Sequence, residues 1–138
     1  TGVQTCALPI SNNLAFFPMQ SLLSKDMACV LIGKKPTIVL CSHYMDYNLD
    51  PEVMCNELNA LMEFVNAGRH KLLISADSNA HSPLWGSADL NPRGIVLEEW
   101  IFNNALDLEN VGDATFSILI LFNKQNIKNK LFANFLIE

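Results

Sequence analysis

An acid and an amide follow an apolar run at residues 72–81, whose sequence is LLISADSNAH. In an extended chain, side chains two residues apart point to the same face, so we expect Asp77 and Asn79 to project together while Ser78 points away. An ionised aspartate can orient a water molecule or accept its proton, and an asparagine amide can donate to a developing phosphate oxyanion. This pair of groups suits hydrolysis of a phosphodiester.

A simple turn is the alternative interpretation of the same residues. Asp and Asn are among the commonest residues at strand ends and in turns, and the spacing alone favours this structural interpretation. Open α/β sheets bind ligands beyond the carboxyl ends of their strands, where residues 78–86 would be free to shape a pocket. The strands and helices around Asp77 and Asn79 therefore help to decide between a catalytic pair and a simple turn.

Three short runs predict buried strands. Residues 27–32 (MACVLI) and 37–42 (TIVLCS) are apolar or β-branched and are separated by a turn that contains a Lys-Lys-Pro sequence. A third strand is expected at residues 71–76, directly before Asp77. The expected site thus follows the third strand.

Two helices are predicted from their caps and their apolar spacing. Asp50 and Pro51 form an N-cap and a first helical residue, and Asn91 with Pro92 repeats that pattern. Gly68 is expected just after the first helix, in the left-handed conformation. The apolar stripes are Met54, Leu58, Leu61, Met62 and Val65 in the first helix, and Val96, Leu97, Trp100, Ile101 and Ala105 in the second.

The order of elements predicts the fold class. Two strands, a helix, a strand and a helix are followed by expected strands at residues 106–108 and 114–118. Such alternation indicates an α/β sandwich with mixed β-sheets.

A longer match accompanies these elements. The segments SADSNAHSPLWGSADLNPRGIVLEEWI (75–101) and NVGDATF (110–116) resemble the endonuclease domain of non-LTR retrotransposons, a branch of the endonuclease/exonuclease/phosphatase family. The resemblance implies a partial four-layer α/β sandwich over residues 11–116. It also implies a Mg²⁺-dependent enzyme that nicks one DNA strand to prime reverse transcription. The expected partners are DNA and a reverse transcriptase domain in the same polyprotein, with no membrane.

The resemblance also implies roles for single residues. Asp77 and Asn79 would position the attacking water and stabilise the transition state, and Tyr44 would lie near the scissile phosphate. Thr115 would contact the substrate, and His81 belongs to the substrate-binding motif without being the catalytic histidine. For Tyr44 the alternative is an aromatic that caps the core, and for Thr115 it is an ordinary strand residue. A loop histidine bonded to the backbone is the favoured alternative for His81.

Four further residues have plainer expectations. Trp85 is expected to be the buried anchor of its loop, and Arg93 to be a solvent-exposed arginine at a helix start. His43 and His70 are expected at surface or strand-end positions.

Part of the family's machinery has no match in this sequence. The family takes metal-binding Asn and Glu residues from its first strands, ahead of the segment that matches here, and it closes the site with a late Asp and a terminal His. We therefore expect no metal site within the chain and no catalysis by the chain as given. Residues 1–10 resemble a translated sequencing adapter. Residues 117–138 are either frameshifted or non-coding sequence, or a strand followed by an amphipathic helix.

Composition sets broad bounds. The chain has 138 residues, half of them hydrophobic, which predicts one domain with a core. The net charge of −5 argues weakly against a surface built wholly for nucleic acid. Cys29 and Cys41 lie in apolar runs and suggest reduced thiols in an intracellular compartment, nuclear or cytoplasmic. No apolar stretch is long enough to cross a membrane.

Two other functions stay open. The same fold serves phosphatases that act on lipid or inositol phosphates, although the P-L-W-G-S and N-x-R-G segments resemble the retrotransposon branch instead. A non-catalytic interaction domain, or a relic that merely folds, is the other alternative.

Overall fold

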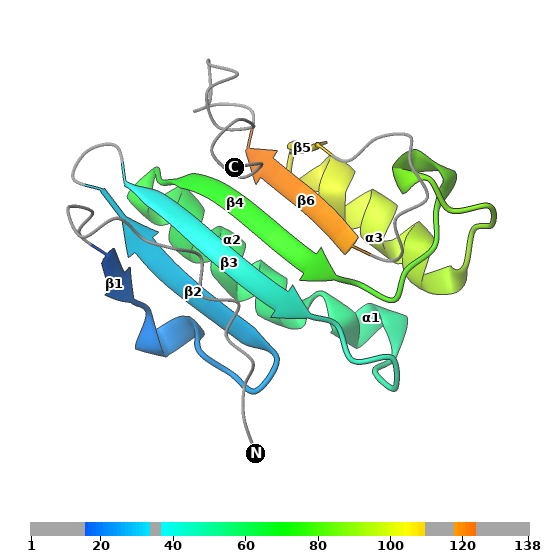
Figure 1. Cartoon of the computed structure of the whole chain (residues 1–138), viewed down its shortest axis with the longest axis horizontal. Helices are drawn as coiled ribbons and strands as arrows, with labels where there is room; N and C mark the ends of the chain where they lie inside the picture. Colours follow the sequence, from blue (N-terminus) through cyan, green and yellow to red (C-terminus); the bar gives the residue numbers. More distant parts are fainter. Residues whose placement is uncertain (1–15, 34–36, 110–117, 124–138) are drawn as a thin grey trace.

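A six-stranded mixed sheet forms the frame of the protein (Figure 1). The computed structural model describes residues 16–33, 37–109 and 118–123. The strands are β1 (Phe16–Pro18), β2 (Met27–Ile32), β3 (Ile38–Tyr44), β4 (Lys71–Asp77), β5 (Leu106–Leu108) and β6 (Ile118–Asn123), arranged in the order β1-β2-β3-β4-β6-β5. Only β3 and β4 run parallel, and every other neighbouring pair is antiparallel.

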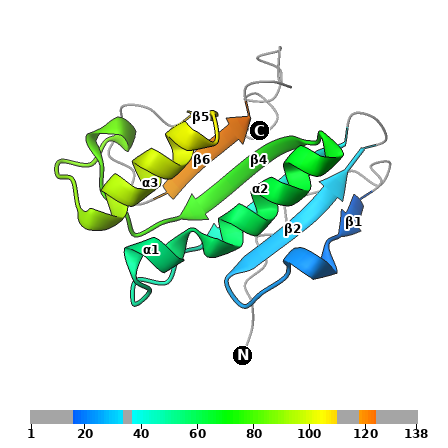
Figure 2. The ribbon, with the colours of Figure 1, turned by 180° about the vertical axis from the view of Figure 1, so that it is seen from behind.

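The helices lie on one face of this sheet. They are α1 (Pro51–Met54), α2 (Asn56–Gly68) and α3 (Pro92–Asn103), with short 3-10 turns η1 (Gln20–Leu22) and η2 (Pro83–Trp85). Figure 1 shows the three α-helices behind the sheet, and Figure 2 shows them in front of it, with α2 across the central strands and α3 beside it. The described residues thus form two layers, one sheet and one set of helices.

Burial alternates along β3 and, from Ile74 onward, along β4, as expected where one face of a sheet is covered. In β3, Val39, Cys41 and His43 are buried, whereas Ser42 and Tyr44 are exposed. Leu72, Ile74 and Ala76 in β4 are buried on the same face as the β3 set. They pack against α2 and α3 through a core that includes Leu58, Leu61, Val65, Leu97 and Trp100.

The parallel pairing of β3 and β4 sets the position of the site. Two parallel neighbours need a crossover connection, which α1 and α2 supply here. Their carboxyl ends consequently lie at the same edge of the sheet, with Tyr44 opposite Asp77. The predicted strands at residues 27–32, 37–42 and 71–76 are confirmed, and β3 and β4 extend to these two polar residues.

The predicted first helix differs from the structure in two respects: it is interrupted, and it ends one residue later than expected. It is divided at Cys55, so that α1 and α2 are separate helices; Asp50 caps α1 by accepting a hydrogen bond from the Glu52 backbone N–H over 2.9 Å. The prediction for Gly68 was wrong, because Gly68 is the last helical residue and Arg69 takes the left-handed conformation with φ 52°.

At position 68, glycine leaves room for the side chain of His70. A Cβ at this position would lie 2.0 Å from Nε2 of His70. That imidazole stacks on Phe64 and pairs through Nδ1 with the Thr37 hydroxyl over 2.9 Å. The missing side chain lets the His70 ring fold back over the helix end.

The α/β class with a mixed sheet is confirmed. In the second helix Leu97 and Trp100 are buried as predicted, but Ala105 lies after the helix with φ 51° and is exposed. The strand expected at 114–118 falls almost wholly outside the described residues. Residues 118–123 form β6, between β4 and β5. None of the helices in the described ranges is long and apolar enough to cross a membrane.

Candidate active site

Tyr44 and Asp77 end two neighbouring parallel strands in register with each other. Their inward-facing neighbours His43 and Ala76 are buried under the helices, so the alternation of the strands turns Tyr44 and Asp77 toward the opposite face. Both side chains are exposed there, Tyr44 at 45%. The structure therefore brings a phenol and a carboxylate together at the carboxyl edge of the sheet.

Asn79 reaches the same edge by a different route from the one predicted. Strand β4 ends at Asp77, and Asn79 takes the left-handed conformation with φ 50°, so the alternation of an extended chain does not continue to it. Asparagine tolerates this conformation better than most residues do. Its side-chain Nδ2 donates to the Met45 carbonyl oxygen over 3.0 Å, which directs the amide back toward the end of β3.

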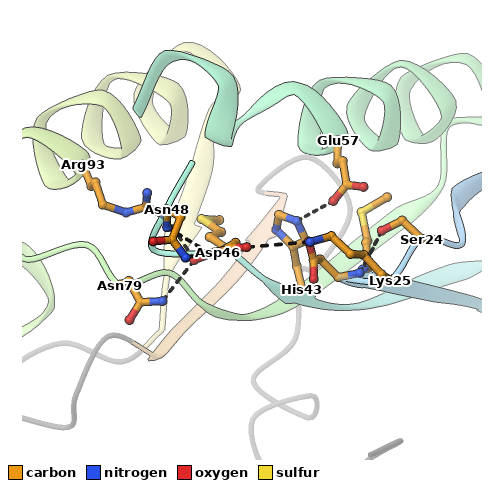
Figure 3. Close-up of polar contacts among 11 residues, drawn as sticks. Ser24, Lys25, His43, Asp46, Asn48, Glu57, Asn79 and Arg93 are labelled. Atoms are coloured by element: carbon orange, nitrogen blue, oxygen red, sulfur yellow. Dashed lines mark hydrogen bonds and ion pairs between the residues drawn. The ribbon is translucent and has the colours of Figure 1, made fainter. Parts of the chain in front are cut away.

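The main chain of Met45 is bonded from three sides. Its N–H donates to the Asp77 carbonyl oxygen over 2.8 Å, and its own carbonyl oxygen accepts from Asn79 and from Arg93. Figure 3 shows the side chains of Asn79 and Arg93 near Asp46, the residue that follows Met45. The residue that follows Tyr44 is therefore held in place by the segment after β4 and by α3.

Arg93 is buried, contrary to the prediction of an exposed helix-start arginine. It is 6% exposed, and its guanidinium donates to three main-chain carbonyl oxygens. The bonds run from Nη1 to Leu49 over 2.8 Å, from Nη2 to Met45 over 3.1 Å, and from Nε and Nη2 to Ser78 over 3.3 and 3.2 Å. A guanidinium with its donors spread over a fork can join the loop after β3 to the loop after β4.

The other residues of the N-x-R-G segment hold His81. The Asn91 side chain caps α3 by accepting from the Gly94 N–H over 2.7 Å, and it also accepts from the His81 N–H over 3.0 Å. A Cβ on Gly94 would lie 1.9 Å from the His81 carbonyl oxygen, so only glycine permits this close approach. Asn91, Arg93 and Gly94 together fix the loop that carries Asn79 and His81.

The His81 side chain pairs with a carboxylate rather than with the backbone, so the favoured alternative for it was wrong. Nδ1 lies 2.9 and 3.1 Å from the two carboxylate oxygens of Asp89. Both side chains are exposed, and this arrangement leaves Nε2 of His81 directed away from Asp89.

Trp85 anchors the intervening loop, as predicted. It is 1% exposed, and its indole N–H donates to the Ala80 carbonyl oxygen over 3.0 Å. The buried Ser82 hydroxyl accepts from the Leu84 N–H and donates to the Glu98 carboxylate. The loop from Ser78 to Gly86 is consequently a packed element that can present its polar residues with little freedom.

A histidine whose burial was not predicted lies directly before Tyr44 in β3. His43, expected at a surface or strand end, is 5% exposed and bonds through Nε2 to the Glu57 carboxylate over 3.0 Å (Figure 3). Burial lowers the pKa of His43, although the nearby Glu57 and Asp26 carboxylates oppose that shift. The signal was present in the alternation, since His43 lies two residues after Cys41 on the covered face.

A lysine also ties the Met45 segment to the start of β2. Lys25 Nζ lies 3.3 Å from the Asp26 carboxylate and 3.7 Å from that of Asp46. The Asn48 backbone N–H donates to Asp46 over 2.9 Å, and this bond, with the lysine charge, holds the pKa of Asp46 below its usual range.

The described residues do not complete a metal site. Magnesium prefers near-octahedral oxygen coordination, in which Asp77 could supply one ligand. Across residues 16–33, 37–109 and 118–123, no three His, Cys, Asp or Glu side chains lie together so as to hold a metal ion. The expected substrate contact Thr115 lies outside the described residues. Of the predicted catalytic and substrate-binding residues, Tyr44, Asp77 and Asn79 lie together at the carboxyl edge of β3 and β4.

These features define an α/β protein with a polar edge at a parallel strand pair, as in enzymes that act beyond the carboxyl ends of their strands. A family model described as endonuclease-reverse transcriptase matches residues 38–119. The chain belongs to this family, which confirms the resemblance drawn from the sequence. The matched segment spans β3, the helices and β4, and it contains Tyr44, Asp77 and Asn79.

A solved structure supports the same fold. The chain is similar to the endonuclease domain of TRAS1, a telomere-specific non-LTR retrotransposon, with a TM-score of 0.75 and 20% sequence identity. The similarity covers 83% of this chain and 57% of that one, so the chain spans a little over half of that structure. No curated protein sequence is significantly similar to the chain.

Proposed function

We propose that the chain is part of a DNA endonuclease domain that hydrolyses a phosphodiester in one strand, with Mg²⁺ as its metal. The resulting 3′ hydroxyl would prime reverse transcription by a polymerase domain of the same polyprotein. The observation that carries the proposal is the meeting of Tyr44, Asp77 and Asn79 at one edge of the sheet in a chain of this family.

The three groups have complementary chemistry. The exposed Asp77 carboxylate can orient a water molecule and accept its proton as the oxygen attacks phosphorus. The Tyr44 hydroxyl can donate to a phosphate oxygen. As the P–O3′ bond breaks, the departing oxygen takes a proton and becomes the 3′ hydroxyl.

Asn79 has one amide hydrogen committed to Met45, and the rest of the amide is available to substrate. Its second N–H can donate to a phosphoryl oxygen that gains charge, while Oδ1 can accept from the water. The bond to Met45 orients the amide before substrate arrives. We propose His81 and Thr115 as further contacts to the DNA, His81 through the ring nitrogen that faces away from Asp89.

The family match favours the endonuclease over a phosphatase of the same fold. The interaction-domain alternative makes a different prediction, because it requires no cutting under any condition. We also expect the chain by itself to be inactive, because its described residues place no second carboxylate ligand for a metal ion beside Asp77 in a cluster of three.

A plasmid-nicking assay with Mg²⁺ tests the proposal. It should be run on the chain and on a protein extended along the parent reading frame to the length of the TRAS1 domain. We expect nicking by the extended protein, about 100-fold or more slower after Asp77→Asn or Asn79→Gly, because each change removes a group acting in the transition state. Tyr44→Phe should lower the rate less.

The control is Tyr47→Phe, which removes a hydroxyl from a tyrosine that is 71% exposed and lies outside the strand ends. It should nick as fast as the parent. Extended protein that binds DNA and never cuts it would support the interaction domain instead. Unchanged rates in both the Asp77 and Asn79 variants would remove these residues from the active site.

A further inference from the structure

Cys29 and Cys41 face each other across β2 and β3. The Tyr44 N–H donates to the Asp26 carbonyl oxygen over 2.7 Å, which makes that pair a hydrogen-bonded one in the antiparallel ladder. Because the two kinds of pair alternate, Cys29 and Cys41 form a non-hydrogen-bonded pair. The Cys29 carbonyl oxygen agrees with this, since it accepts from Met19 on the far side, away from β3.

This kind of pair suits a disulfide. Directly opposed residues at non-hydrogen-bonded positions have Cα atoms about 4.5 Å apart and closely placed Cβ atoms. A disulfide accepts Cα separations from about 4.4 to 6.8 Å. Both side chains lie on the helix-covered face and are free thiols, 3% and 4% exposed. The typical Cα spacing of such a pair thus lies within the range that a disulfide accepts.

The two thiols already interact. A hydrogen bond from Cys41 lowers the pKa of Cys29, while the same bond and burial raise the pKa of Cys41. The thiolate is the nucleophile in disulfide exchange, so Cys29 is the thiol prepared to attack first. The third described cysteine, Cys55, lies between α1 and α2 with its pKa raised to about 11, mainly by burial.

We propose that Cys29 and Cys41 are a redox modification site, at which a small disulfide such as glutathione disulfide converts the two thiols into a cross-strand disulfide. The Cys29 thiolate attacks one sulfur of the small disulfide and releases one molecule of its thiol. The Cys41 thiolate then attacks the Cys29 sulfur of the mixed disulfide and releases the second. The protein loses two electrons and two protons, which the two released thiols carry away.

The proposed disulfide would involve β3, the strand that ends at Tyr44. A Cys29–Cys41 bond would fix β3 against β2 in the observed register, and β3 ends at Tyr44. Since both thiols are buried, the first attack requires a local opening of β2 from its neighbours. Oxidation of these thiols should therefore be slower than oxidation of an exposed thiol. It should become faster when a small amount of denaturant, too little to unfold the protein, is added.

Mapping of the bond in the intact chain tests the proposal. The native protein is incubated with glutathione disulfide, quenched with acid, alkylated, and digested with trypsin and an aspartate-specific protease that separates Cys41 from Cys55. We expect mass spectrometry to find the Cys29 and Cys41 peptides joined, with the sum of their masses reduced by two hydrogens. The oxidised protein should also melt at a higher temperature than the reduced one, because the bond restricts the unfolded chain.

Single cysteine-to-alanine variants test whether the cross-link is specific to Cys29 and Cys41. Cys55→Ala should leave the cross-link intact, whereas Cys29→Ala and Cys41→Ala should each abolish it. The proposal is overturned if native Cys29 and Cys41 remain fully alkylated under conditions that cross-link the unfolded chain. It is equally overturned if they end as separate glutathione adducts, join Cys6 or Cys55 instead, or leave the melting temperature of the linked protein unchanged or lower.

Discussion

Asn79 and Arg93 donate hydrogen bonds to the same acceptor, the main-chain carbonyl oxygen of Met45, over 3.0 and 3.1 Å. Asn79 is a candidate catalytic residue, and Arg93 is a buried cation with further bonds to Leu49 and Ser78. The shared acceptor means that the orientation of the Asn79 amide depends on a residue in α3. Arg93 thus helps to fix the acceptor that the Asn79 side chain uses.

Replacing Arg93 with methionine should destabilise the protein by about 3 kcal/mol, because the carbonyl oxygens of Met45, Leu49 and Ser78 lose their charged donor. Urea denaturation measures this change. Arg69→Met is the matched control, since Arg69 is exposed, and it should change stability by no more than about 0.5 kcal/mol. Equal effects of the two substitutions would show that the Arg93 bonds contribute little.

Gly94→Ala should destabilise the protein by about 3 kcal/mol, although alanine ordinarily favours a helix, because the new Cβ would meet a main-chain oxygen at 1.9 Å. Gly68→Ala is the comparison. Its Cβ would meet the His70 imidazole, a side chain that can rotate away. Thermal melts should therefore rank Gly94→Ala as the less stable variant, and the reverse order would refute the close approach of α3 to His81.

Asn79→Ala should be less stable than Asn79→Gly by about 1 kcal/mol, because only the alanine is strained in the left-handed conformation. Both variants lose the bond to Met45, so their difference isolates the backbone. Asn66 supplies the control, since it lies exposed within α2. There the alanine variant should be the more stable, by a similar amount. Equal stability of the two Asn79 variants would argue against the observed turn.

Stability should fall as the pH drops below the ordinary histidine pKa of 6.5, because burial lowers the pKa of His43 in the folded chain. The unfolded chain then binds more protons than the folded one, and the loss extends from 6.5 down to the lowered folded value. Urea midpoints measured at steps from about pH 7.5 to 5.5 should fall as the pH is lowered.

Two variants assign this pH dependence. His43→Leu should flatten that part of the profile. Glu57→Gln should steepen it, because the Glu57 carboxylate favours protonated His43. A parental slope in His43→Leu would assign the titration to another group.

Local patterns in the sequence were sufficient for the elements around the site. Apolar runs predicted β2, β3 and β4, and the Asp-Pro and Asn-Pro pairs predicted where α1 and α3 begin. These features depend on residues a few positions apart, whose spacing follows from the geometry of strands and helices. The motif after β4 was also sufficient to predict the family, which the family model confirms.

Residues whose partners are distant in the sequence were misjudged. Arg93 was expected in solvent, yet its partners lie 15, 44 and 48 residues earlier in the chain. His43, whose burial was not predicted, bonds to Glu57, which lies 14 positions later. Amino-acid type alone predicts exposure for a charged side chain, and only its neighbours reveal that its bonds are satisfied inside.

The order of residue types along the chain determined which segments are strands and helices and which polar groups stand at their ends. Tertiary structure decided that Tyr44 lies beside Asp77, that Asn79 turns back to Met45, and that the Arg93 charge is buried against main-chain oxygens. The physical reason is that side-chain spacing is a local property, whereas strand pairing and the satisfaction of buried donors depend on which distant segments meet.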